Sequence, residues 1–159
     1  MSVIIQGTQL RDISLGRYTQ GKTATIGDDG TFQLFTVAGG EVLITALWGK
    51  VTTAITDAGE DINITIDPTT GDSVQLTQDN DLGTTDTAAG AVLGFIYDQD
   101  GTNNKPLCVK NEGEPLRFVC PTGEIEMTVT AGTANEDGVI EWYCTWVPLT
   151  PGATVVAAA

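Results

Sequence analysis

The chain of 159 residues contains no histidine and only three serines, Ser2, Ser14 and Ser73. Without histidine, the Ser–His and Cys–His pairs that activate a nucleophile are excluded. A pair of carboxylates for glycoside cleavage could come from the 21 Asp and Glu residues, but the sequence singles out no two of them. We therefore expect a protein that is not an enzyme.

Positive charge is also scarce, because 7 Lys and Arg residues stand against 21 Asp and Glu residues, for a formal net charge of −14. Binding to a nucleic-acid backbone needs clustered Lys or Arg, and so does attraction to an anionic membrane surface. We expect neither nucleic acid nor membrane as a partner. The acidic surface favours solubility, and it would also keep copies of the protein, or a particle that carries them, from aggregating.

Long hydrophobic runs are missing. No stretch approaches the roughly 18 apolar residues that span a membrane, and residues 2–6 are too short for the apolar region of a signal peptide. We expect synthesis in the cytoplasm.

Cysteine is limited to Cys108, Cys120 and Cys144, which form no metal-binding spacing and have no histidine to complete one. The sequence predicts a hairpin between residues 107–109 and 116–120. The register that gives this hairpin the better apolar face does not place Cys108 opposite Cys120. We therefore expect three reduced thiols rather than a disulfide, and no metal or other cofactor.

Alternating hydrophobic residues predict strands in most of the chain. Residues 62–66 alternate strictly, residues 67–72 have the composition of a turn, and residues 73–77 return as the second strand of a hairpin. Residues 124–131 alternate as well, with Ile125, Met127 and Val129 on the inward face.

Further strands are expected at residues 31–37, 41–48 and 91–97. Residues 41–48 are apolar on both faces, which is typical of a central strand. Residues 51–55 either extend that strand or belong to one short helix over residues 51–58. Together the segments indicate an all-β fold, a single-domain β-sandwich or barrel of about eight to ten antiparallel strands.

Two parts of the chain differ in composition. Residues 1–30 are polar and interrupted by glycine, and they are expected to form an extended N-terminal arm or loosely attached segment with at most one strand. Residues 31–159 are expected to form the β-sandwich or barrel domain, which ends in an apolar tail.

Residues 16–23 match the phosphate-binding pattern G-x-x-x-x-G-K-[ST]. That pattern works only between a strand and a helix, whose N-terminal amides bind phosphate. Residues 24–30 contain two glycines and two aspartates, so a stable helix is not expected there. We predict that this match does not bind nucleotide.

Two further segments match a functional pattern, one for calcium binding and one for glycosylation, but both are better explained as ordinary structure. Residues 98–104 are acidic and could begin a calcium-binding loop, which requires Gly at its sixth position and Glu at its twelfth. Here the glycine stands at the fourth position and Val109 at the twelfth, so a plain acidic turn is favoured. Asn63 and Thr65 fit a glycosylation acceptor, but they lie inside a predicted strand of a chain in which no secretory signal is seen.

The last strand carries two of the three tryptophans. Ile140, Trp142, Cys144 and Trp146 fall on one face of this strand. Trp48 and Trp142 are expected in the core, whereas Trp146 fits either the core or a contact surface.

Residues 138–158, G-x-I-E-W-Y-x-x-W-x-P-L-x-x-G-A-x-V-x-x-A, resemble the ends of small structural proteins of tailed bacteriophages, which include head decoration or cement proteins. Residues 49–56, GKVTTAIT, are also similar to such chains. The resemblance implies a virion structural protein, often a homotrimer, that binds the major capsid protein on the outer capsid surface. The negative charge agrees with the outer surface, because packaged DNA would repel it.

The apolar residues without an obvious strand partner are the candidate interface residues: Val3, Ile4, Ile5, Trp146, Pro148 and Leu149. The alternative function is that of a carbohydrate-binding β-sandwich module on a phage tail or fibre. Exposed, coplanar tryptophans would support this alternative, and buried ones would count against it.

Overall fold

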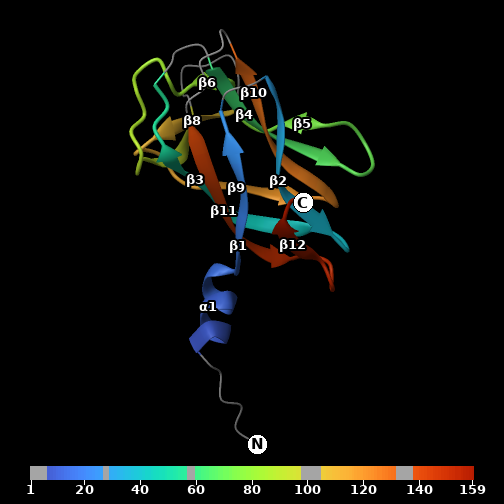
Figure 1. Ribbon diagram of the computed structural model, residues 1–159. Coiled ribbons are helices and arrows are strands. Elements are labelled where there is room, and N and C mark those ends of the chain that lie inside the picture. Colours follow the sequence, from blue (N-terminus) through green and yellow to red (C-terminus); the bar gives the residue numbers. More distant parts are fainter. Residues whose placement is uncertain (1–6, 27–28, 57–59, 98–104, 132–137) are drawn as a thin grey trace, which may run out of the picture.

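The computed structural model describes residues 7–26, 29–56, 60–97, 105–131 and 138–159. Within these ranges the chain folds as two antiparallel sheets of six strands each, packed as a sandwich, with one short helix projecting from one end (Figure 1). The predicted all-β, antiparallel sandwich is confirmed. The described residues form twelve strands rather than eight to ten, and two of them, β5 and β6, contain only two residues each.

The first sheet, sheet A, has the strand order β1–β11–β3–β7–β8, and β9 also pairs with β3. Its strands are β1 (Arg17–Thr25), β3 (Val42–Thr53), β7 (Val92–Tyr97), β8 (Pro106–Lys110), β9 (Leu116–Cys120) and β11 (Val139–Pro148).

The second sheet, sheet B, has the order β12–β2–β10–β4–β5, and β6 also pairs with β4. Its strands are β2 (Gly30–Ala38), β4 (Glu60–Pro68), β5 (Val74–Gln75), β6 (Asn80–Asp81), β10 (Gly123–Ala131) and β12 (Thr154–Ala157). The predicted hairpin of residues 62–66 and 73–77 is confirmed by the pairing of β4 with β5.

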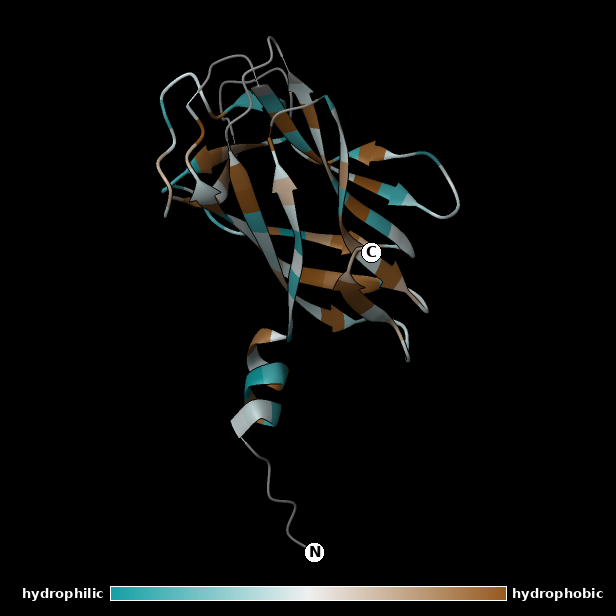
Figure 2. Ribbon diagram, viewed as in Figure 1, coloured by the Kyte–Doolittle hydropathy of each residue, from teal (hydrophilic) through white to brown (hydrophobic). Residues whose placement is uncertain are grey.

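The core lies between the two sheets, because each long strand turns one alternating set of side chains inward. Figure 2 shows that hydrophobic residues, coloured brown, occur along the strands of both sheets. The inward sets of β10 and β11 are those that the sequence predicts: Ile125, Met127, Val129, Ile140, Trp142, Cys144 and Trp146 are all buried. Strand β3 is central, as its composition predicts, with β11 on one side and both β7 and β9 on the other.

The N-terminal region differs from the predicted arm. Residues 17–25 form β1, which pairs along its length with β11, so the segment that projects from the sandwich ends at Gly16. Before it stands helix α1 (Gly7–Leu15), which ends where Gly16 adopts a φ of 89° and donates its N–H to the carbonyl of Asp12. Of the two alternatives for residues 51–55, the structure has the strand, since β3 continues to Thr53, and no helix is found in the described part of residues 51–58.

The prediction of a hairpin between residues 107–109 and 116–120 is wrong. Strand β8 pairs with β7, and β9 pairs with β3, so these two neighbours in sequence never pair with each other. The loop between them instead folds against β7, where Glu114 and Phe95 form an isolated bridge. The three thiols are nevertheless free, as expected, and all are buried.

Candidate functional site

Helix α1 exposes its apolar side chains. No residue of the helix is buried, and Leu10, Ile13 and Leu15 are 57%, 71% and 61% exposed. A helix of nine residues has little stability of its own in water, so it depends on packing against something else. Because α1 covers so little of the sandwich (Figure 1), its apolar residues are available to a partner.

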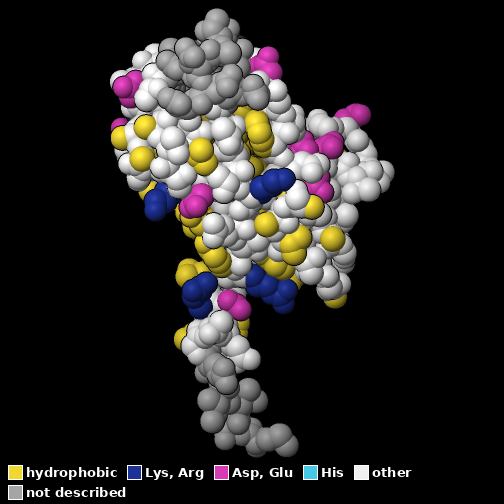
Figure 3. Space-filling model, viewed as in Figure 1, with side chains coloured by type: hydrophobic (Ala, Val, Ile, Leu, Met, Phe, Trp, Pro, Cys, Tyr) yellow, Lys and Arg dark blue, Asp and Glu magenta, His cyan; other side chains and the backbone are white. Residues whose placement is uncertain are grey.

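The segment that contains α1 also differs in charge from the rest of the chain. Residues 1–26 hold three of the seven basic residues, Arg11, Arg17 and Lys22, and one of the 21 acidic residues, Asp12. In Figure 3, Lys and Arg side chains gather around the junction of α1 with the sandwich, and Asp and Glu side chains lie mostly farther up this face. The exposed apolar helix is therefore joined to a strongly acidic body through a strand, β1, that contains the basic residues Arg17 and Lys22.

A groove of about 500 Å³ lies between α1 and the end of β11, and Ile13, Trp146 and Pro148 are among its lining residues. Of the predicted interface residues, Trp146 is only 4% exposed, whereas Pro148 and Leu149 are exposed beside it. Val3, Ile4 and Ile5 lie outside the described residues. We call Leu10, Ile13, Leu15, Pro148 and Leu149 the arm-and-tail surface.

The residues of the phosphate-binding pattern have packing roles. They lie in strand β1 rather than in a loop followed by a helix. A Cβ at Gly21 would lie 2.6 Å from Cζ of Phe35, so only glycine leaves room for that ring. Lys22 donates a hydrogen bond of 2.6 Å from Nζ to the carbonyl of Ala159. This geometry provides none of the clustered amides that bind phosphate.

A cluster of three aromatic rings lies on the outer face of sheet A. Trp48 on β3 stacks on Tyr143 on β11, with 5.7 Å between ring centroids and 20° between planes. Tyr18 on β1 stacks on Tyr143 at 6.1 Å and 23°, and it also contacts Trp48 at 6.4 Å with a tilt of 42°. The hydroxyl of Tyr143 donates to a carboxylate oxygen of Glu141 at 2.5 Å, and this hydrogen bond raises the pKa of Tyr143 to about 12.

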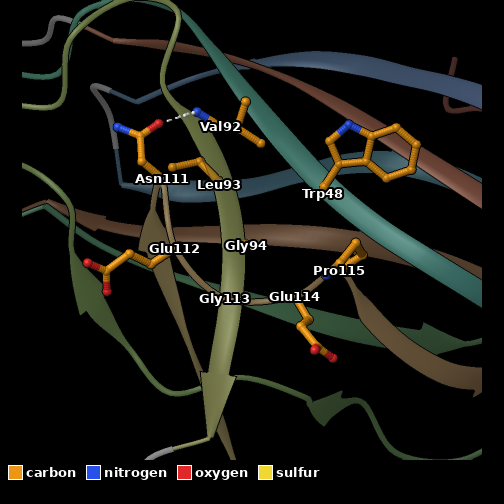
Figure 4. Close-up of a pocket in the computed structure, with 9 residues that line it drawn as sticks. All are labelled: Trp48, Val92, Leu93, Gly94, Asn111, Glu112, Gly113, Glu114 and Pro115. Carbon is orange, nitrogen blue, oxygen red and sulfur yellow. Dashed lines mark hydrogen bonds between the residues drawn. The ribbon is translucent and has the colours of Figure 1, made fainter.

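Trp48 also borders a pocket with a volume of about 560 Å³ (Figure 4). The lining residues come from β3, β7 and the loop after β8: Trp48, Val92, Leu93, Gly94, Asn111, Glu112, Gly113, Glu114 and Pro115. Gly94 allows the loop to approach, since a Cβ there would lie 2.5 Å from the carbonyl oxygen of Glu112. The sequence did not indicate this pocket, because its walls come from segments that are far apart in the chain.

The three tryptophans divide between the core and the outer face of sheet A. Trp142 is fully buried and Trp146 nearly so, whereas Trp48, expected in the core, is half-buried on the outer face of sheet A. Two buried tryptophans count against a platform of several tryptophans for carbohydrate. The aromatic cluster nevertheless gives the surface one indole whose orientation is held by ring contacts.

The cysteines are not placed for chemistry. Burial raises the pKa of Cys108 and of Cys144 to about 12, and burial together with the nearby Glu124 carboxylate does the same for Cys120. Thiols with such pKa values carry almost no thiolate at neutral pH, and the thiolate is the nucleophile.

Among the described residues, no group of three or more Cys, Asp or Glu side chains is placed to hold a metal ion. The acidic turn at residues 98–104 lies outside the described residues. Asn63 lies inside β4, as predicted, and its amide is committed to a hydrogen bond of 2.8 Å with Asp79.

No helix in the described ranges is long and apolar enough to cross a membrane. Comparison with protein-family models, with curated proteins and with solved structures found no match to this chain.

Proposed function

We propose that this protein is a non-enzymatic virion structural protein that binds the outer surface of a bacteriophage capsid and stabilises it. Its partner is the major capsid protein. The observation that carries the proposal is the arm-and-tail surface, a set of exposed apolar side chains on a strongly acidic protein. The capsid as partner follows from the resemblance of residues 138–158 to small phage structural proteins.

The arm-and-tail surface suits a contact across capsid subunits. Leu10 and Ile13 stand three residues apart and therefore on one face of α1, which would pack into an apolar groove of the capsid. Burial of these side chains would supply the packing that so short a helix lacks. The acidic remainder of the chain then faces away from the packaged DNA.

Stabilisation requires many copies acting together. A homotrimer would engage several capsid subunits at once, and linked contacts raise the overall affinity well above that of a single contact. We therefore include self-association into a trimer in the proposal.

The test is co-sedimentation with capsids assembled from the major capsid protein of the same phage genome. A double variant, Leu10→Asp with Ile13→Asp, should lose most of the binding. Val74→Asp is the matched control, because Val74 is 54% exposed on β5, in the other sheet. Binding of the wild type and the control, but not of the double variant, supports the proposal.

Two other outcomes have definite meanings. If the wild type does not sediment with capsids, the proposed function is wrong. If the double variant binds as well as the wild type, the function stands and the arm-and-tail surface is not the contact. Light scattering after gel filtration measures whether the free protein is a trimer.

A further inference from the structure

We propose that the pocket beside Trp48 binds a neutral sugar, with the ring of the sugar against the indole. This inference is independent of capsid binding, because the pocket and the arm-and-tail surface share no residue. A capsid protein with such a site would hold its particle to polysaccharide.

The first support is the fixed orientation of the indole. Tyr143 packs against Trp48 from the β11 side, and Tyr18 contacts both Tyr143 and Trp48. The pocket lies on the other side of β3, where Gly49 and Lys50 pair with Leu93 and Val92. The indole is thus stacked on one side and open to the pocket on the other. Pyranose rings present apolar C–H faces, and a preorganised aromatic ring binds them at a small entropic cost.

The second support is the set of polar groups opposite the indole. Figure 4 places Trp48 and Pro115 on one side of the pocket and Asn111 and Glu112 on the other. Asn111 accepts a hydrogen bond of 3.1 Å from the N–H of Val92 through Oδ1, which fixes the amide. Its Nδ2 then remains a donor without a partner among the described residues.

The backbone of Asn111 is held as firmly as its side chain. Its N–H donates to the carbonyl of Val92 at 2.6 Å, and its φ is 53°, a left-handed conformation that asparagine tolerates better than most residues. The exposed carboxylates of Glu112 and Glu114 stand on the same loop. Amide and carboxylate groups together supply the donors and acceptors that sugar hydroxyls require.

The third support is the charge around the pocket, which disfavours an acidic ligand. Glu112 and Glu114 contribute two negative charges. Lys50 pairs in register with Val92, which lines the pocket, whereas Lys110 directs its Nζ to the carbonyls of Thr85 and Asp86. An acidic sugar would therefore meet both glutamates and the net charge of −14.

The volume of the pocket is also suitable. About 560 Å³ lies within the range of roughly 300–1,000 Å³ that is typical of small-molecule sites. The site takes one or two sugar units of a longer chain.

The experiment uses the full chain and hexasaccharides of glucose, galactose, mannose and N-acetylglucosamine. Two-dimensional NMR follows the indole N–H signals, of which the chain has three, one for each tryptophan. We expect at least one hexasaccharide to shift the Trp48 signal in a saturable way. The signals of the buried Trp142 and Trp146 should move much less.

Variants identify the groups that bind. Trp48→Ala should weaken binding by about tenfold or more. Asn111→Gly keeps a residue that accepts the left-handed φ but removes the amide, so it should also weaken binding. Tyr97→Ala is the control, because Tyr97 is an exposed aromatic residue of β7, 67% exposed, that does not line this pocket.

The proposal is overturned if no hexasaccharide shifts the Trp48 signal at sugar concentrations up to about 10 mM. A titration to that concentration detects even sites with a Kd in the millimolar range. It is also overturned if Trp48→Ala, shown to be folded by its melting transition, binds as tightly as the wild type. A Trp48 signal that responds to tetramethylammonium but to none of the sugars would indicate a cation site instead. Should Trp48→Ala not fold, the wild-type NMR titration and Asn111→Gly still decide the question.

Discussion

The indole Nε1 of Trp146 donates a hydrogen bond of 3.0 Å to Oγ1 of Thr19, and the same hydroxyl donates to the carbonyl of Val155 at 3.2 Å. Trp146 lies on β11 and Thr19 on β1, both in sheet A, whereas Val155 lies on β12 in sheet B. One threonine therefore connects the two sheets at the end of the sandwich where the C-terminal strand closes the core.

We predict that Thr19→Val destabilises the protein by about 1–3 kcal/mol, because it leaves the indole N–H and a carbonyl without partners. Thr25→Val, on the exposed face of the same strand, should have little effect. Urea unfolding of each variant measures the difference. Adding Trp146→Phe should cost less in the Thr19→Val background than in the wild type, and equal costs would show that the two side chains are not coupled.

The second prediction concerns Glu126, which is only 9% exposed on β10. Burial raises the pKa of its carboxyl above the usual value of 4.5, and the charges of Asp67 and Glu124 raise it further, while a hydrogen bond from Gln33 partly opposes the shift. The folded protein therefore binds this proton more tightly than the unfolded chain does. The resulting stabilisation is present at acidic pH and is lost as pH rises through the raised pKa.

We expect the melting temperature to fall between mildly acidic and neutral pH. Asp61 contributes with the same sign, because burial and then Asp79 and Asp81 raise its pKa. Glu126→Gln should raise the melting temperature at pH 7.5 by about 1–2 °C and reduce this decline. Glu41→Gln is the control, because it removes the same charge from an exposed position. An equal effect of both variants would assign the change to net charge rather than to the site of Glu126.

The third prediction is that all three thiols resist modification in the native protein. Their burial, and pKa values of about 12, leave almost no reactive thiolate at pH 7.5. Thiol titration should count three after denaturation without reductant and almost none before it. A count of one after denaturation would reveal a disulfide and contradict the structure.

The fourth prediction separates packing from nucleotide binding at residues 16–23. Gly21→Ala should destabilise the protein by about 1–3 kcal/mol, because the added methyl group overlaps the ring of Phe35. Adding Phe35→Leu should relieve part of that overlap. ATP or GTP with Mg²⁺ should leave the melting temperature of the wild type unchanged, whereas a concentration-dependent rise would demonstrate binding to the native state.

Alternation of side chains along single strands was sufficient to predict the all-β sandwich. The strict alternation of residues 124–131 and the set Ile140, Trp142, Cys144 and Trp146 identified inward faces correctly, because a strand turns successive side chains to opposite sides whatever its neighbours are. Residues 17–25 were harder to recognise. They bury only Ala24 and are otherwise polar or glycine, so the strand that they form at the edge of sheet A has almost no apolar pattern.

Strand pairing was decided by the tertiary structure. The sequence determined that β8 and β9 are strands and that their cysteines are buried, but local alternation carries no information about which strand lies beside which. Long-range packing placed β9 on β3 and β8 on β7, and in doing so folded the 111–115 loop over Gly94. The aromatic cluster and the pocket beside Trp48 exist only because strands distant in sequence became neighbours, since their side chains meet across the sheet and not along the chain.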